Sequence, residues 1–169
     1  MGSIRALDPP TLESSGLEQV VGGDDTTPLN QFNPQDLYRQ LARPVGRLSV
    51  ELKSGKSAYC TAAIISDDLI LSNAHCLLDA TGRNVVRSGV LSMGYLTSGI
   101  TEETEQFEVD VGAPVEIGMP GAEGAPDYAI LRVTSGDPGQ TWGSVRLSSL
   151  APLEGGSLAI MHHPLGFPM

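Results

Sequence analysis

Short apolar runs dominate the chain from about residue 45 onward. They are rich in Val, Ile, Leu and Tyr, and clusters of Gly, Pro, Asp or Ser separate them. The runs are VGRLSVEL, YCTAAII, DLILSN, VVRSGVLSMGYL, EQFEVDV, APVEIG, DYAILRV, SVRLSS and GSLAIM. Strands at this close spacing, with hardly a helical period among them, predict an all-β barrel or sandwich.

The composition is that of a globular chain and argues against two classes of binding partner. The 169 residues are 40% hydrophobic and 18% charged and include 20 Gly and 12 Pro, which indicates a real core and many turns. The formal net charge is -10 and no basic stripe is present, so nucleic acid and anionic membrane surfaces are not expected partners. No run reaches the roughly 20 apolar residues of a membrane helix, and the first residues lack the pattern of a signal peptide.

The stretch AIISDDLIL predicts a β-hairpin with Asp67 and Asp68 as its loop. That register places Cys60 opposite His75, one residue from Cys76, so we expect the two cysteines within disulfide reach. A disulfide would clamp the turn that carries His75. Two buried thiols are the alternative, because the sequence does not fix the redox compartment.

His75 ends an apolar strand, and Asp127 heads another. A histidine that acts as a general base needs a carboxylate on its other ring nitrogen, which selects the tautomer and stabilises the imidazolium. Asp127 precedes largely apolar residues, and a buried carboxylate must find a partner. Pairing with His75 is one interpretation, and simple capping of a turn is the other.

The segment CTAAIISDDLILSNAHC resembles the histidine segment of chymotrypsin-like serine peptidases, and DYAILRV resembles their aspartate strand. VVGGDD, RPVGRLSV and AIMHHPLGFP extend the resemblance toward the bacterial branch that includes the glutamyl endopeptidases. The resemblance implies a double β-barrel. It divides the chain into an N-terminal extension (1–19), a complete first barrel (20–140), and a linker with the opening strands of an incomplete second barrel (141–169).

The resemblance also implies a serine endopeptidase that hydrolyses protein or peptide substrates. His75 would be the general base and then the general acid, and Asp127 would orient it. Cys60 and Cys76 match the pair that brackets the histidine loop in this family. His162 and His163 would lie in the second barrel, and a zinc site on them is not expected because adjacent strand residues face opposite ways. No metal or cofactor is expected.

The nucleophilic serine of such an enzyme is missing from the sequence. No serine stands in Gly-x-Ser-Gly or Gly-x-Ser-x-Gly, and a complete double barrel needs about 200 to 250 residues. We therefore expect a chain that ends before the nucleophile, with the serine on a continuation or on a partner chain. A pseudo-peptidase that serves as a protein-binding module is the alternative. A cysteine peptidase using Cys76 is disfavoured, because adjacent side chains project badly for mutual proton transfer.

Two further features leave alternatives open. VVGG at residues 20–23 resembles the mature start of trypsin-like enzymes, but Gln19 precedes it, which favours a Gly-rich turn leading to an edge strand. The missing signal peptide favours the cytoplasm, while bracketing cysteines favour export.

Overall fold

The computed structural model describes residues 27–97, 104–118, 126–156 and 158–169. Within these ranges the chain is built mainly of strands, which confirms the predicted all-β class. None of the helices in the described part has the length and apolar character that crossing a membrane requires. The VVGG segment lies outside the described residues.

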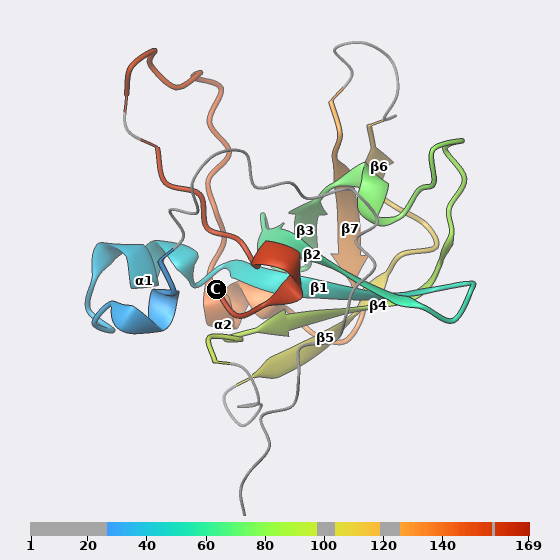
Figure 1. Cartoon of the computed structure of the whole chain (residues 1–169), viewed down its shortest axis with the longest axis horizontal. Helices are drawn as coiled ribbons and strands as arrows, with labels where there is room; N and C mark the ends of the chain where they lie inside the picture. Colours follow the sequence, from blue (N-terminus) through green and yellow to red (C-terminus); the bar gives the residue numbers. More distant parts are fainter. Residues whose placement is uncertain (1–26, 98–103, 119–125, 157) are drawn as a thin grey trace, which may run out of the picture.

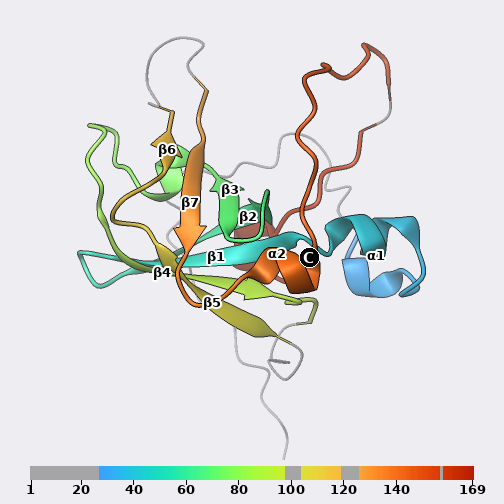
Figure 2. The ribbon, with the colours of Figure 1, turned by 180° about the vertical axis from the view of Figure 1, so that it is seen from behind.

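The strands form one antiparallel sheet that closes on itself. They are β1 (Val45–Leu52), β2 (Ser57–Ile64), β3 (Leu69–Ser72), β4 (Val86–Met93), β5 (Glu105–Asp110), β6 (Glu116–Ile117) and β7 (Ala129–Val133). The sheet order is β3-β2-β1-β4-β5-β7-β6, and pairing of β3 with β7 closes the barrel. Figure 1 shows the arrangement, and Figure 2 shows β3 beside β7 from behind.

Alternation of apolar and polar residues along the strands fills the barrel. In β1, for example, Leu48 and Val50 are buried while Ser49 between them is partly exposed. Gly46 permits close packing of β1 on β4, because a Cβ atom there would lie 2.9 Å from the Ser92 carbonyl oxygen and still closer to the Met93 sulfur. The barrel is therefore a packed core, with the site residues at its rim.

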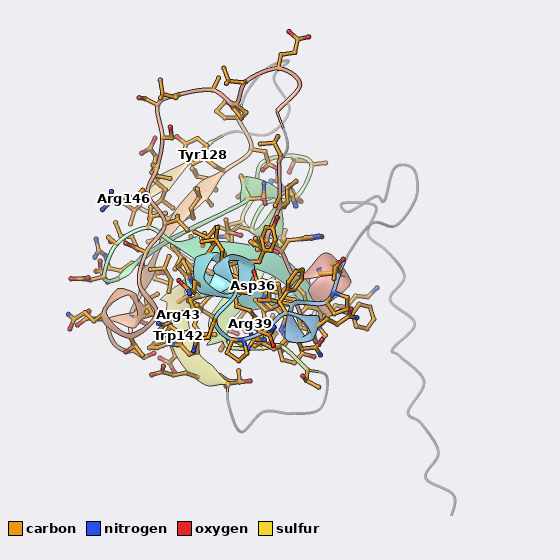
Figure 3. All side chains as sticks on the ribbon, turned by 90° about the vertical axis from the view of Figure 1, so that its left-hand side faces the viewer. Asp36, Arg39, Arg43, Tyr128, Trp142 and Arg146 are labelled. Carbon is orange, nitrogen blue, oxygen red and sulfur yellow. A yellow bond between two sulfur atoms is a disulfide. The ribbon has the colours of Figure 1, made fainter. Side chains whose placement is uncertain are left out.

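Short helices connect and flank the strands. They are η1 (Leu29–Gln31), α1 (Leu37–Ala42), η2 (Ala74–Cys76), α2 (Pro138–Trp142) and η3 (Pro164–Gly166). Asp36 caps α1 by accepting a hydrogen bond from the Tyr38 backbone N–H at 3.4 Å. Arg43, just past α1, donates to the Thr141 carbonyl oxygen in α2 at 3.0 Å, and Figure 3 labels it together with Trp142. Residues 98 positions apart in the sequence are thus hydrogen-bonded to each other beside the barrel.

The predicted register of the β2–β3 hairpin is wrong by one residue. Ala63 pairs with Leu71 and Ile64 with Ile70, whereas the two-residue loop would have paired Ile64 with Leu71. The Ile65 N–H donates to the Leu69 carbonyl oxygen at 2.9 Å, so residues 66–68 form a three-residue loop. Ser66 therefore belongs to the loop and not to the paired residues, and this shifts the pairing by one residue.

The runs at 144–149 and 156–161 were predicted as strands, and the structure corrects this. No strand is present in residues 143–156 or 158–169. The Val145 N–H donates to the Ile64 carbonyl oxygen at 2.8 Å, but no strand in the described part of the chain pairs with residues 144–149, 156 or 158–161. Strand propensity reflects packing on a pleated neighbour, and that neighbour is lacking here. Figure 1 shows the orange-red stretch standing away from the barrel.

Candidate active site

His75 lies in η2, the tight turn that follows β3. Ala74 and Cys76 on either side are buried, at 0% and 6% exposure, so the backbone of the turn is anchored in the core. The Leu77 N–H closes the turn by donating to the Ala74 carbonyl oxygen at 2.9 Å. The His75 side chain itself remains 26% exposed, so its ring is accessible from solvent.

A disulfide between Cys60 in β2 and Cys76 in η2 fastens the turn to the barrel. The Cα atoms are 6.4 Å apart, which confirms the prediction that they lie within disulfide reach. Because Cys76 is bonded to Cys60, it offers no thiol, and the cysteine-peptidase alternative fails in this state. The described residues hold no free cysteine.

Asp127 reaches His75 because β3 and β7 pair with each other. Ser72 at the end of β3 pairs with Ala129 at the start of β7, so the residues beyond these ends meet at the same rim. The Asn73 side-chain amide donates to the Asp127 carbonyl oxygen at 3.0 Å and fixes this backbone. Asn73 was not among the residues predicted for the site, although its place directly after the strand that precedes His75 could have indicated it.

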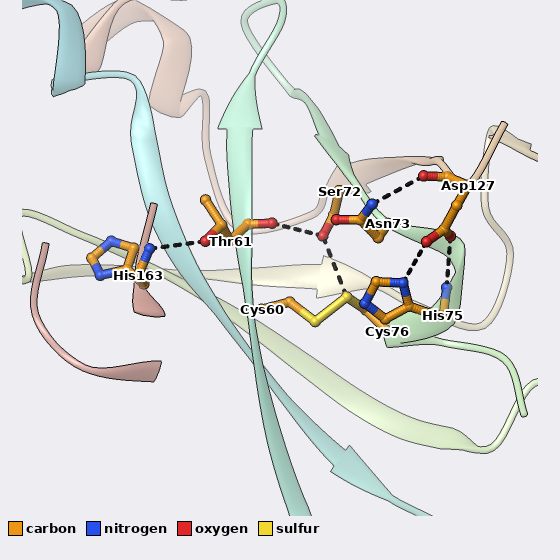
Figure 4. Close-up of a disulfide and its surroundings, with 8 residues drawn as sticks. All are labelled: Cys60, Thr61, Ser72, Asn73, His75, Cys76, Asp127 and His163. Carbon is orange, nitrogen blue, oxygen red and sulfur yellow. Dashed lines mark hydrogen bonds and ion pairs between the residues drawn. A yellow bond between two sulfur atoms is a disulfide. The ribbon is translucent and has the colours of Figure 1, made fainter. Parts of the chain in front are cut away.

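The Asp127 carboxylate contacts both N–H groups of His75. Oδ1 accepts the His75 backbone N–H at 3.1 Å, and Oδ2 accepts Nδ1–H of the ring (Figure 4). The structure thus brings together the two residues that the sequence singled out. With Nδ1 as the donor, Nε2 of the neutral ring carries the free lone pair, which is the state a general base requires.

The electrostatics of Asp127 fit an orienting carboxylate. Burial by itself would raise the pKa of Asp127, but the hydrogen bonds from the His75 ring and backbone outweigh it and hold that pKa below its usual value. The carboxyl is therefore ionised at neutral pH. An ionised carboxylate stabilises the imidazolium that forms when Nε2 takes up a proton.

His163 lies apart from this pair. It is 1% exposed, and its Nδ1 donates to the Phe167 carbonyl oxygen at 3.0 Å. Burial lowers its pKa to about 4, so the ring is neutral at ordinary pH. Its backbone N–H donates to the Thr61 hydroxyl in β2 at 2.9 Å. His163 therefore serves the packing of the terminal segment on the barrel.

Arg47, which was not predicted to have a role, contacts the same segment. Its guanidinium lies 4.0 Å from the Tyr95 ring centroid and 5.0 Å from that of Tyr59, and it donates to the Gly166 carbonyl oxygen at 3.1 Å. Cation–π contacts and a charged hydrogen bond together orient the segment 163–167. Only the fold brings these residues together, so no local motif could have found them.

Comparison with known proteins adds one sequence-level match. Residues 60–169, which include His75 and Asp127, match the family model of the trypsin-like peptidase domain. No curated protein matches the chain.

Solved structures give weaker likenesses. The thermostable serine protease AL20 from an extremophilic microorganism is 20% identical, with a TM-score of 0.45, over 62% of this chain and 50% of that one. A structure titled HL collagenase is 18% identical, with a TM-score of 0.40, over 57% and 38%. A structure titled GrC is 16% identical, with a TM-score of 0.43, over 71% and 48%. The chain therefore spans half or less of each of these proteins.

Proposed function

The chain belongs to the family of trypsin-like peptidase domains, and on that premise we propose that it is the His- and Asp-bearing part of a serine endopeptidase. The substrate class is a protein or peptide. The assignment to the glutamyl-endopeptidase branch and the boundaries 1–19, 20–140 and 141–169 remain predictions. His75 acts as the base, Asp127 orients it, and the nucleophilic serine comes from residues outside this sequence.

One observation carries the proposal. Asp127 accepts hydrogen bonds from both the backbone and the ring of His75, and the disulfide from Cys60 to Cys76 holds the turn in place. The bond to the backbone N–H alone would leave the imidazole free to turn, and the bond to Nδ1 removes that freedom. The double contact fixes the orientation and the tautomer of the imidazole, which is what nucleophile activation requires.

The chemistry follows from this geometry. Nε2 of His75 takes the proton of the serine hydroxyl as its oxygen bonds to the substrate carbonyl carbon. The imidazolium then gives that proton to the amide nitrogen as the carbon–nitrogen bond breaks, which leaves an acyl-enzyme. Water repeats the cycle on the acyl group. Asp127 stays ionised throughout and stabilises each imidazolium.

We assign the nucleophilic serine to residues outside this sequence, because no serine within it has the flanking glycines of the family's nucleophile loop. None of the serines has glycine both two residues before it and directly after it, as the nucleophile loop of this family requires. That loop supplies both the hydroxyl and the backbone N–H groups that bind the oxyanion. The serine therefore belongs to a continuation of the chain or to an associated second chain.

Labelling with a fluorophosphonate probe tests the proposal. We expect no labelling of the 169-residue chain, and labelling of one serine when the continuation is present, either covalently or as a separate fragment. Strong labelling of the isolated chain would contradict the assignment of the serine. A complete protein that binds peptides and never reacts would instead be a binding module.

A further inference from the structure

Cys60, His75 and Cys76 form a cluster of three metal-ligating side chains at the rim of the barrel. One ring nitrogen of His75 and the two sulfur atoms all lie within 4.8 Å of one another. The sulfurs are joined to each other, so neither is a thiolate ligand in this state. Reduction of the disulfide would supply two such ligands beside an imidazole that is already oriented.

We propose that a dithiol reductant converts this cluster into a zinc site made of two thiolates and one imidazole. The dithiol gives two electrons and two protons to the sulfur–sulfur bond, which breaks into two thiols, and the dithiol itself becomes a disulfide. Zinc then displaces the two thiol protons as it binds. Water completes the four ligands, as in zinc sites with three protein ligands.

The geometry needs only small side-chain movements. With zinc–sulfur and zinc–nitrogen bonds of about 2.3 and 2.0 Å, tetrahedral ligand atoms lie about 3.4 to 3.8 Å apart. The sulfurs must separate to this distance, while the ring nitrogen already lies within 4.8 Å of both. Cys60 sits within β2 and Cys76 in a hydrogen-bonded turn, so the backbone keeps the ligands together after the bond is broken.

The neighbouring side chains already include hydrogen-bond partners for the residues that would bind the metal. Asp127 accepts the Nδ1 proton of His75, which leaves Nε2 free and makes the imidazole more basic. Figure 4 shows this second ring nitrogen turned toward the disulfide. The Ser72 hydroxyl lies 3.8 Å from the Cys76 sulfur and donates to the Thr61 carbonyl oxygen at 2.8 Å, so rotation of this hydroxyl would let it donate to a thiolate at Cys76 instead. A carboxylate–imidazole–metal arrangement thus needs no new partner.

Access from solvent is sufficient. The His75 side chain is 26% exposed, and Cys60 and Cys76 are 8% and 6% exposed, which places the cluster just below the surface. Zinc on Nε2 would occupy the nitrogen that must take the proton of the serine. If the proposed function holds, the reduced and zinc-loaded form is inactive, and removal of zinc with reoxidation restores activity.

Cobalt binding tests the site without any need for catalysis. Co²⁺ is titrated into the oxidised and the reduced chain, and the thiolate-to-cobalt charge-transfer absorption is recorded together with the far-ultraviolet circular dichroism. We expect one equivalent of cobalt to give this absorption in the reduced chain only, with the β-type spectrum kept, and zinc to displace it. Absence of the absorption, or loss of the β-type spectrum on reduction, would overturn the proposal.

Substitutions test the contribution of each ligand to cobalt binding. His75→Ala should weaken cobalt binding by more than about a hundredfold, and Asp127→Asn by about ten- to a hundredfold. The pair Cys60→Ser and Cys76→Ser should abolish the charge-transfer band. His162→Ala is the matched control, because it removes an imidazole outside the cluster. Equal binding by His75→Ala and His162→Ala would show that the cysteines act without His75 and would overturn the proposal.

Discussion

Asp127 fixes His75 through two contacts that cannot both survive a rotation of the imidazole. One carboxylate oxygen accepts the backbone N–H and the other accepts Nδ1–H. Rotation about either side-chain bond of His75 would break the second contact. At the scale of single residues, Asp127 therefore determines both the orientation and the tautomer of His75, the proposed base.

Asp127→Asn tests this role in the complete enzyme. The asparagine side chain can present an N–H to Nδ1, which moves the imidazole proton to Nε2 and leaves no free lone pair toward the serine. We expect kcat to fall by about 10⁴-fold, with a much smaller change in KM. Asp110→Asn, which alters only a turn cap at Gly112 and Ala113, is the control. Comparable losses in both variants would argue against a specific role for Asp127.

His163 makes stability depend on pH. Its pKa is about 4 in the fold, mainly because of burial, and its ordinary value is 6.5. The unfolded chain therefore binds more protons between these values, and the free energy of unfolding falls as the pH drops from about 6.5 toward 4. The loss amounts to roughly 3 kcal/mol over the whole window.

His163→Phe should remove this part of the pH dependence, because phenylalanine does not titrate. Urea unfolding at pH 7 and pH 4.5 is the measurement, with His162→Phe as the matched control. We expect the stability of the chain to fall less on acidification in His163→Phe than in the control. Identical losses in the two variants would contradict the assignment to His163.

Among the elements, the β1–β4 pair depends on a glycine. A side chain at Gly46 would meet the Met93 sulfur and the Ser92 backbone. We expect Gly46→Ala to lower the free energy of unfolding by about 1 to 3 kcal/mol through overpacking. Gly112→Ala is the control, because its Cβ would have ordinary contact with Asp110 at 3.5 Å. Equal unfolding midpoints in denaturant would refute the tight packing at Gly46.

The disulfide fastens η2 to β2 across a sequence separation of 16 residues. A crosslink of that span stabilises a fold by about 3 kcal/mol, largely by restricting the unfolded chain. Replacing both Cys60 and Cys76 with serine should therefore lower stability by roughly this amount in denaturant unfolding. A double variant as stable as the wild type would show that the turn is held by its other contacts alone.

Some elements could be predicted from sequence patterns and others could not, and the physical reasons for the successes differ from those for the failures. The runs VGRLSVEL and DYAILRV are predicted as strands and form β1 and β7, because their apolar residues face the core of the barrel. The hairpin register failed because it depends on whether Ser66 pairs or joins the loop. Runs 144–149 and 156–161 have the composition of strands, but composition cannot show whether a partner strand is present.

The candidate site was predictable only in part. His75 and Asp127 could be singled out from their places next to strand ends, and Cys60 from the predicted hairpin, and all three from the resemblance. The second contact of Asp127, to the His75 backbone, depends on the geometry of η2, and Asn73 reaches Asp127 only because β3 pairs with β7. Such contacts form only when the barrel closes, so a single stretch of sequence cannot predict them.

Seen as a whole molecule, the chain exposes apolar side chains in one region beyond the barrel. They are at least 68% exposed, and they are Leu147, Leu150, Leu153, Leu158 and Ile160. Large apolar side chains this exposed along one segment are candidates for burial against another surface. Residues that carry the proposed nucleophile would cover these side chains if they packed against this segment.

The isolated chain should therefore self-associate through this region. We expect Leu150→Gln combined with Leu153→Gln to shift the chain toward the monomer in analytical ultracentrifugation, with little change in its unfolding midpoint. Surface substitutions at Ser148 and Glu154 to Gln are the matched control. A monomeric wild-type chain, or no effect of the leucine substitutions, would show that this region does not mediate self-association.

The most direct test of the account is the turnover of His75→Ala in the complete enzyme, compared with the wild type and with His162→Ala on the same peptide substrate. Because the serine and its base act as one unit, we predict that His75→Ala lowers kcat by several orders of magnitude, about 10⁴-fold or more, while the circular dichroism spectrum is unchanged. His162→Ala should stay close to the wild type. Turnover by His75→Ala within a few-fold of the wild type would contradict the central claim that this histidine is the base.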